Sequence, residues 1–447
     1  HIMNKFLNIF KISDLRKKLA FTGALLLVYR LGGKIPLPGI DSGVLQSIMG
    51  DASNSLLGLY DTFVGGFLSQ ASIFTLGIMP YISASIIIQL LGSVVPYFQK
   101  LQKEGELGRK KIIQLTRYGT VVIASMQAVG IAIYLANLTG TVNGAEVNVV
   151  SNSNFYFYFV TIITLVTSTL FIMWLGEQIS DHGIGNGISL IIMCGILAQF
   201  PFVLETEWPN IGDSPYRYLF LALLMFLITF IVVSVTTGIR KIPVQYAKRV
   251  VGRKVYGGQS THIPLKILTA GVMPIIFAQA LMFLPNTVAS FLPDGNFFGD
   301  ALRDYFAPTS IMYSVFFALL IIVFTYFYTA IAFNPVDVAD NMRKQGGFIP
   351  GVRPGKATSD YIDKILTRVT LPASIFLALV AIFPTILFRA YDGDINYSLV
   401  GFFGGTSLLI IVGVALDTLQ QIESHMVMRN YDGFLKSGRI RGRSRRY

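Results

Sequence analysis

Residues 73–95 read IFTLGIMPYISASIIIQLLGSVV, a run of 23 residues without one charged side chain. A spanning helix needs about 20 mainly apolar residues, because the hydrocarbon core of a bilayer is about 30 Å thick and each helical residue rises about 1.5 Å. This stretch has both the length and the composition. It therefore predicts a helix that crosses a membrane.

The rest of the chain repeats this pattern. Of its 447 residues, 53% are hydrophobic and 13% are charged, whereas a soluble domain carries about 25% charged residues. The charged residues are confined to short stretches between apolar runs, which argues against a water-soluble fold. We expect an all-α polytopic membrane protein with ten transmembrane helices. Their windows are Leu19–Leu31, Ile73–Val95, Tyr118–Leu138, Phe155–Leu175, Gly185–Phe202, Tyr218–Val235, Ile267–Leu284, Ile311–Phe333, Leu371–Phe388 and Phe402–Leu419.

The basic residues predict how the chain is oriented. Ten spans put both termini on one side of the membrane, and Lys and Arg are enriched on the cytoplasmic side. With a cytoplasmic N-terminus, 31 of the 36 basic residues lie on the cytoplasmic side and Arg30 lies in the first span. The four on the opposite side are Lys34, Arg217, Arg303 and Arg389. We therefore expect both termini in the cytoplasm.

The spans divide the chain into four predicted parts. These are a cytoplasmic amphipathic segment at 1–18, an N-terminal half at 19–202, a C-terminal half at 203–422 and a basic cytoplasmic tail at 423–447. The connections at 238–266 and 334–368 are much longer than the few residues that usually join packed helices. We expect both to project from the cytoplasmic face as ordered, basic elements.

Two short motifs recur five spans apart. KIPL at 34–37 follows the first span and KIPV at 241–244 follows the sixth, while GIMP at 77–80 lies in the second span and GVMP at 271–274 in the seventh. Because five is an odd number, two such units have opposite orientations, as in many transport proteins. We expect two inverted five-helix halves. Pro80 and Pro274 each remove a backbone hydrogen bond, so they predict either a hinge or a static kink.

The sequence offers little sign of catalysis. It contains no metalloprotease, serine hydrolase or nucleotide-binding motif, and its single cysteine, Cys194, excludes an intrachain disulfide. We therefore expect no enzyme activity, cofactor or metal. The spans hold few ionisable residues, chiefly Arg30 and Asp417, which disfavours an ion-coupled carrier. A secondary transporter of a small solute and a scaffold without a pore remain alternatives.

Several longer motifs resemble those of the SecY family of bacterial protein-conducting channels, and the resemblance covers nearly the whole chain. The motifs are SIF at 72–74, LGIMPYISASI at 76–86, GIGNGIS at 183–189, YAKR at 246–249, QSTHIPLK at 259–266, IPGVRPG at 349–355 and FGGTSLLI at 403–410. The resemblance implies a clamshell of two halves around a central hourglass pore, with a lateral opening to lipid between the second and seventh spans. Such a channel passes unfolded secretory polypeptides across the plasma membrane and releases hydrophobic segments into lipid.

The resemblance also implies a pore constriction made of apolar side chains. The matching positions here are all isoleucine: Ile78, Ile82, Ile188, Ile192, Ile276 and Ile410. A dry ring of this kind excludes ions by dewetting, yet it closes around a moving chain of any sequence. Ordinary buried or lipid-facing isoleucines are the alternative for each position taken alone.

A further match is to the short plug helix that blocks the outer side of the closed pore. It covers 61–70 and includes Asp61, Phe63, Gly65, Gly66, Phe67 and Leu68. The polarity and glycines of this stretch predict a loosely held element with few buried contacts. An outer surface loop is the alternative.

The family's motor ATPase SecA and the ribosome dock on the cytoplasmic loops. The matching basic residues are Arg240, Lys241, Lys248, Arg249, Arg253, Lys254 and Arg353. Basic side chains suit both partners, because acidic protein surfaces and RNA phosphates are anionic. The competing explanation for these basic residues is a purely topological role, in which positive charge keeps the loops on the cytoplasmic side. The resemblance also implies the subunits SecE and SecG, with preproteins and signal sequences as substrates.

Overall fold

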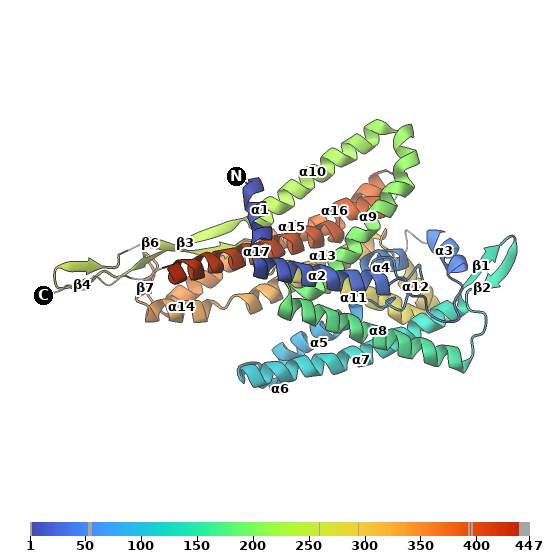
Figure 1. Ribbon diagram of the computed structural model, residues 1–447, viewed down its shortest axis with the longest axis horizontal. Coiled ribbons are helices and arrows are strands. Elements are labelled where there is room, and N and C mark those ends of the chain that lie inside the picture. The colour runs from blue at the N-terminus through green and yellow to red at the C-terminus, as the bar shows by residue number, and fades with distance from the viewer. Residues whose placement is uncertain are drawn as a thin grey trace.

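Each of the ten apolar windows contains a helix in the computed structural model, which describes residues 2–51, 56–258, 260–293, 295–391, 394 and 397–437. Most of these helices run roughly along the long axis of the molecule, as Figure 1 shows. They are α2 (Ser13–Gly32), α5 (Met79–Val94), α7 (Glu106–Asn137), α8 (Phe155–His182), α9 (Gly187–Asp213), α10 (Pro215–Thr237), α11 (Met273–Ser290), α13 (Ile311–Ala332), α15 (Lys356–Ala390) and α17 (Thr406–Ser437).

Not every one of these helices is long and apolar enough to cross a bilayer alone. Among the described residues, seven helical stretches meet this requirement. An eighth is the pair formed by α5 and α6 (Pro96–Lys103), whose axes are bent by 96°. The other two are α2, whose first turns carry Asp14 and Lys17, and the short α11. Both pack against longer helices, α2 on α8 and α11 on α13.

The remaining elements gather at the two ends of the molecule (Figure 1). At one end lie α14 (Pro335–Lys344), β3 (Ile239–Tyr246), β4 (Arg249–Val251), β5 (Lys254–Tyr256), β6 (Ser260–Lys266) and β7 (Gly347–Phe348). At the other lie α3 (Ser42–Asp51), α12 (Phe297–Tyr305), β1 (Thr139–Val142) and β2 (Ala145–Asn148). The other short helices are α1 (Ile2–Lys11), α4 (Leu56–Val64) and α16 (Tyr397–Gly404). Both long connections are therefore ordered, as expected.

The inverted repeat is visible in the backbone. Residues 73–78 form turns before α5, and residues 267–272 form turns before α11. Each turn region contains a glycine with positive φ at the same position, Gly77 at +57° and Gly271 at +68°. Glycine adopts this conformation without the steric cost that other residues meet. The two halves thus start their second helix in the same way.

The KIP motifs also take equivalent positions in the two halves. Leu37 N–H donates to the carbonyl of Ala71 and Ile73 N–H donates to Ile35, so the first motif pairs with the chain just before α5. In the second half, β3 contains the motif and pairs antiparallel with β6, which runs into α11. The repeat is therefore a unit in which the KIP motif pairs with the chain just before a turn and a helix, through an isolated bridge in the first half and a two-stranded ladder in the second.

This geometry corrects the expectation for the two prolines. Pro80 and Pro274 lie in the first turn of α5 and α11, not inside a longer helix. The N–H groups of a first helical turn have no partner within the helix, so proline removes no hydrogen bond there. The predicted spans are interrupted by the turns before Met79 and Met273, and a hinge role for the prolines stays a prediction.

The predicted boundaries between the four parts fall inside helices of the structure. Helix α9 continues through Pro201 to Asp213, so the division predicted at 202/203 falls inside a helix, and Ser214 separates α9 from α10. The residue before a proline rarely adopts a helical backbone conformation, because the proline ring clashes with it, and Ser214 precedes Pro215. Likewise α2 begins at Ser13, within the predicted N-terminal segment, and α17 continues to Ser437, within the predicted tail. The rest of that tail, 438–447, lies outside the described residues.

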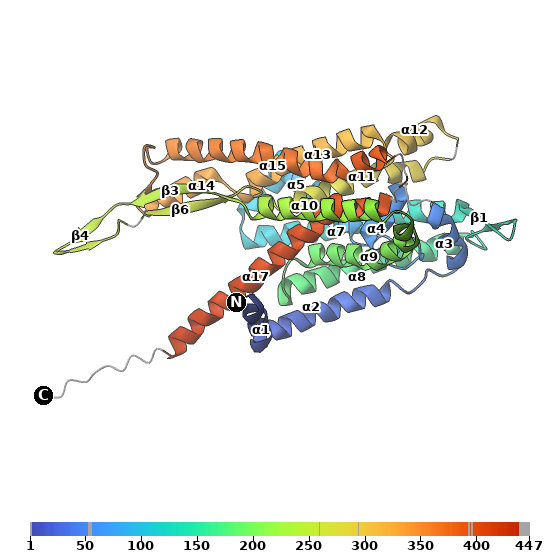
Figure 2. The same cartoon turned by 90° about the horizontal axis from the view of Figure 1, so that it is seen from above.

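One buried apolar core joins the two halves. It contains Leu165 and Ile192 from the first half and Ile276 and Phe317 from the second. Figure 2 places α13 and α15 along one edge of the molecule and α2 and α8 along the opposite edge. Helix α4 lies between the halves, because it contacts α9 of the first and α11 of the second.

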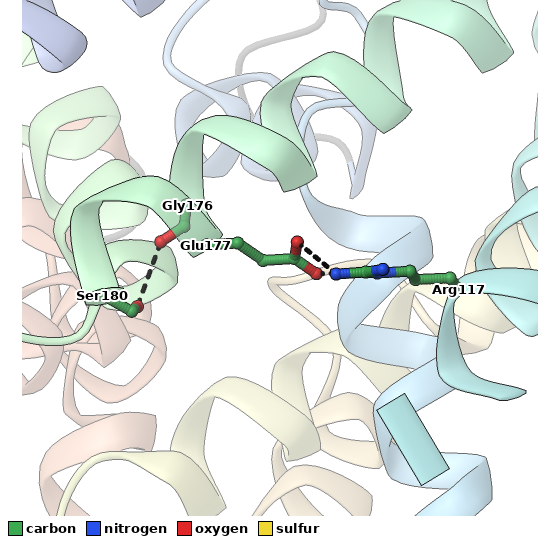
Figure 3. Close-up of polar contacts among 4 residues, drawn as sticks. All are labelled: Arg117, Gly176, Glu177 and Ser180. Atoms are coloured by element: carbon green, nitrogen blue, oxygen red, sulfur yellow. Dashed lines mark hydrogen bonds and ion pairs between the residues drawn. The ribbon is translucent and has the colours of Figure 1, made fainter. Parts of the chain in front are cut away.

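Within the first half, a pair of charged side chains ties α7 to α8 (Figure 3). Arg117 donates to both carboxylate oxygens of Glu177, with Nη2 2.7 Å from Oε2 and Nε 3.2 Å from Oε1. Two parallel hydrogen bonds of this kind also fix the relative orientation of the two side chains. Close by, Ser180 donates to the carbonyl of Gly176.

Candidate functional site

The six isoleucines of the predicted ring lie on four helices that join the two halves. Ile78 precedes α5 and Ile82 lies in its first turn, Ile276 lies on α11, and Ile410 lies on α17. The other two, at 188 and 192, lie one turn apart on α9. Helix α5 contacts α11, α11 contacts α17, and α17 contacts α9. The four helices are therefore linked by a continuous series of contacts across the two halves.

Burial separates these six side chains into two groups. Ile78, Ile82, Ile192, Ile276 and Ile410 are all at most 4% exposed and belong to the same core. Ile188 is only half-buried and lies beside Gly176 of α8. The backbone at Ile188 is fixed by Asn186, whose side chain accepts its N–H and caps α9. That the six side chains surround a common axis stays a prediction.

The segment 61–70 differs from the expected plug helix in two respects. The helix here is α4, which ends at Val64, and turns follow it. The segment is also well packed: Phe67 is fully buried and Leu68 is 1% exposed. Asp61 accepts the N–H of Ser69 at 3.0 Å, which closes the turn on itself. The expectation of few buried contacts was wrong, because the aromatic side chains of this segment pack between the two halves.

Those aromatic contacts reach both halves. Phe67 lies edge-on to Tyr29 of α2, with ring centroids 5.3 Å apart. Tyr60 and Phe63 both lie edge-on to Phe283 of α11, at 5.2 and 5.8 Å. Edge-to-face pairs at these separations are favourable beyond the apolar area they bury. The segment therefore contacts the helices that carry the isoleucines.

Side chains on α2 and α9 donate hydrogen bonds to the backbone of this segment. Arg30 Nη1 donates to the carbonyl of Gly65 at 2.9 Å, and Gln199 Nε2 donates to the same carbonyl at 2.8 Å. Tyr29 donates to the carbonyl of Val64 at 3.2 Å. No sequence motif predicts these contacts, although a lone arginine within a span is itself a signal of function.

A second polar group was also missed. Gln279 of α11, only 1% exposed, donates to the hydroxyl of Tyr313 at 3.2 Å and accepts the hydroxyl of Thr406 at 3.3 Å. Gln279 is one turn from Ile276, and Thr406 is one turn from Ile410. These bonds link α11 to α13 and to α17, one turn from the isoleucines.

The lateral opening stays a prediction; at its predicted place α5 meets α11 and α13 in a seam. Tyr328 of α13 donates to the side-chain oxygen of Gln89 on α5, and its ring packs on Phe277 of α11. Elsewhere along the seam, a cavity of about 580 Å³ is lined by Tyr60, Leu68 and Met79 together with residues of α7, α11 and α12. Buried residues of α5 and α11 on the two sides of the seam belong to the same apolar core.

The predicted partner-binding residues lie at the end of the molecule that carries β3–β6. Arg240, Lys241, Lys248, Arg253, Lys254 and Arg353 are exposed, whereas the side chain of Arg249 lies outside the described part. The β4–β5 hairpin also exposes Val250, Val251 and Val255, each at least 60%. An exposed mixture of cations and valines is typical of a docking surface.

Comparison with known proteins identifies the family. The model of the SecY family matches residues 72–419. Protein translocase subunit SecY of Escherichia coli (strain K12) is 44% identical over 439 residues and covers 97% of each chain. The chain belongs to the SecY family. The subunit of Halalkalibacterium halodurans is 46% identical over 439 residues, covering 96% of this chain and 99% of the relative.

Solved structures show that the fold is that of SecY channels. A structure described as a protein conducting channel has a TM-score of 0.63 and 19% identity over 92% of both chains. Sec61 in the canine ribosome–channel complex has a TM-score of 0.59 and 18% identity over the same shares. The ten-helix arrangement in two halves fits these structures. The alternative of a small-solute transporter finds no support among these relatives.

Proposed function

We propose that this chain is the channel subunit of a protein translocase, which passes unfolded secretory polypeptides across a bacterial plasma membrane. The observation that carries the proposal is the buried isoleucine layer on α5, α9, α11 and α17, in a chain of the SecY family. An apolar constriction forms no lasting bond to a client, so it accepts polypeptides of any sequence while excluding hydrated ions.

The segment 61–70 acts as the plug in this proposal. It lies between α9 and α11, and residues of it contact both halves. Hydrophobic segments leave through the seam between α5 and α11, because apolar side chains partition into lipid. Neither step makes or breaks a covalent bond, so the chain itself acts as a channel and not as an enzyme.

Energy and direction come from partners. The exposed cations of β3–β5 and Arg353 form the docking surface for SecA or the ribosome, which places that end and both termini in the cytoplasm. SecE holds the two halves together and SecG completes the complex. The ribosome appears in the description of one similar structure, Sec61 in the canine ribosome–channel complex.

One experiment tests the proposed function. The chain is reconstituted into vesicles with SecE, and SecA, ATP and a preprotein are added. We expect the preprotein to become resistant to protease inside the vesicles. Protection no greater than that without ATP would contradict a translocation channel. Uptake of a small solute in the same vesicles would instead indicate a transporter.

A further inference from the structure

The turn at Gly65–Gly66 is held by donors from two different helices. Arg30 comes from α2 and Gln199 from α9, and both donate to the single carbonyl oxygen of Gly65. Tyr29 donates to the preceding carbonyl, that of Val64. A carbonyl oxygen has two lone pairs, so Gly65 is fully satisfied by this arrangement. All three donors lie on the same side of the segment, that of the first half.

Arg30 has no carboxylate partner among the described residues. Besides its bond to Gly65, its guanidinium lies over the ring of Phe67, 4.9 Å from the centroid. Within a membrane span a charged side chain is costly unless it is well solvated by protein groups. Here two parts of one segment, a carbonyl and an aromatic face, supply that solvation. If the segment moved away, Arg30 would lose both.

The shape of the turn is matched to the same surface. Gly65 and Gly66 have φ of +89° and +81°, which other residues rarely adopt. A Cβ at Gly65 would lie 2.9 Å from Cα of Gly195 on α9, and one at Gly66 would collide with the side chain of Gln199. The two glycines therefore permit both the turn and its close approach to the donors.

On the opposite side, Phe63 of the segment packs edge-on to Phe283 of α11. Tyr60 and Leu68 line the cavity of about 580 Å³. Moving the segment would break the hydrogen bonds to Gly65 and Val64 together with the packing of Phe63 and Phe67.

We propose that Arg30 and Gln199 form a latch on the Gly65 carbonyl that holds the segment 61–70 in its closed position. They act as positioning residues, and Tyr29 supports them. The latch concerns the movement of the segment, and its effect on the channel rests on the plug role proposed above. Hydrogen bonds to a backbone carbonyl are weak enough to be exchanged for contacts with a client chain.

The test measures the exposure of the segment directly. The reference protein is the full chain with its co-purified subunits in vesicles, carrying Cys194→Ala and Leu68→Cys, so that one thiol reports on the segment. Leu68 is buried in the closed position. Its rate of reaction with a membrane-impermeant maleimide is compared in Arg30→Lys, Arg30→Gln and Gln199→Leu backgrounds. Lys34→Gln, which removes an exposed charge near the same end of α2, is the matched control.

We expect labelling roughly tenfold faster in Arg30→Gln and severalfold faster in Gln199→Leu, since a bond from a charged donor is stronger than one from an amide. Arg30→Lys retains the charge but not the reach to the carbonyl, so it should also label faster. Lys34→Gln should match the reference. Unchanged rates in all three latch variants, at an unchanged melting temperature, would overturn the latch.

A measurement of resting ion conductance in the same variants distinguishes the latch proposal from the plug proposal. Faster labelling together with a higher conductance supports both. Faster labelling with unchanged conductance supports the latch and contradicts the plug role of the segment. Import of a preprotein by the unmodified chain is a separate measurement, so failure of the proposed function is distinguishable from failure of the latch.

Discussion

Isoleucine stands at all six positions of the predicted ring. Its side chain carries no polar atom, and branching at Cβ restricts it to few rotamers. Such residues present a stiff, dry surface that water wets poorly. Five of the six belong to the apolar core in this structure, beside the hydrogen bonds that Gln279 makes one turn away.

Replacing one of these isoleucines with serine should make the resting channel leak ions. Each of Ile82, Ile192 and Ile276 is at most 2% exposed, and a hydroxyl there would draw water into the layer. In planar bilayers we expect resting conductance on the order of tenfold higher, because burial of an isoleucine side chain is worth about 1.5–3 kcal/mol. Ile163→Ser, at an exposed position of α8, is the control. Unchanged conductance in all three would remove them from the constriction.

Among the helices, the junction of α8 and α9 shows how small residues fix an approach. Gly187 N–H donates to Ser180 Oγ at 2.9 Å, and Ser180 in turn donates to the Gly176 carbonyl. A Cβ at Gly187 would collide with that carbonyl. The GIGNGIS motif therefore lets α9 begin directly against α8, which positions Ile188 and Ile192.

Gly187→Ala should destabilise the protein by about 1–3 kcal/mol, since the added methyl has no space and the two helices must separate. The melting temperature in detergent and the yield of folded protein would measure this. Gly212→Ala is the matched control on the same helix, because nothing lies within 4 Å of a Cβ there. It should be neutral or stabilising by about 0.5–1 kcal/mol. Equal melting temperatures for the two variants would show that the close approach carries no energy.

For the whole molecule, the contact between the two halves matters most. Tyr328 of α13, whose ring packs on Phe277 of α11, donates a hydrogen bond across the seam to Gln89 of α5. The rest of the described contact between α5 and α11 is apolar core packing, which has no directional bonds to break. It suits an opening through which hydrophobic segments would leave.

Tyr328→Phe should ease this opening. The substitution keeps the ring that packs on Phe277 but removes the hydroxyl, so the bond to Gln89 is lost. We expect preproteins with weakly hydrophobic signal sequences to be imported more efficiently, by a few fold, since one hydrogen bond is worth about 0.5–1.5 kcal/mol. Tyr326→Phe, on the same helix, should leave import unchanged. Equal import by both variants would show that this bond does not restrain the seam.

Charge at one end of the molecule should govern docking. Arg253→Glu combined with Lys254→Glu reverses two exposed charges at the tip of the β4–β5 hairpin. We expect weaker binding of SecA or ribosomes, and a binding affinity that depends less on salt concentration, because fewer ion pairs form. Lys34→Glu, just beyond the C-terminal end of α2 and far from the hairpin, should not change binding. Equal affinities at low salt would contradict a docking role for the hairpin.

Much of this molecule was predictable from the order of its residues. The ten apolar windows and the repeated KIP and GIMP/GVMP motifs are local properties, and a bilayer imposes a length on any apolar helix regardless of its neighbours. They therefore predicted the helices and the two halves without any knowledge of contacts. Membership of the SecY family followed from motifs of the same local kind.

Only the tertiary structure decided where α5 and α11 begin, how tightly the segment 61–70 is packed, and which side chains meet. The bonds from Arg30 and Gln199 to Gly65, and from Tyr328 to Gln89, join residues 35, 134 and 239 positions apart. Hydropathy carries no information about such pairs, because they depend on how whole helices pack. The position of the segment 61–70 is therefore set by packing between distant parts of the chain.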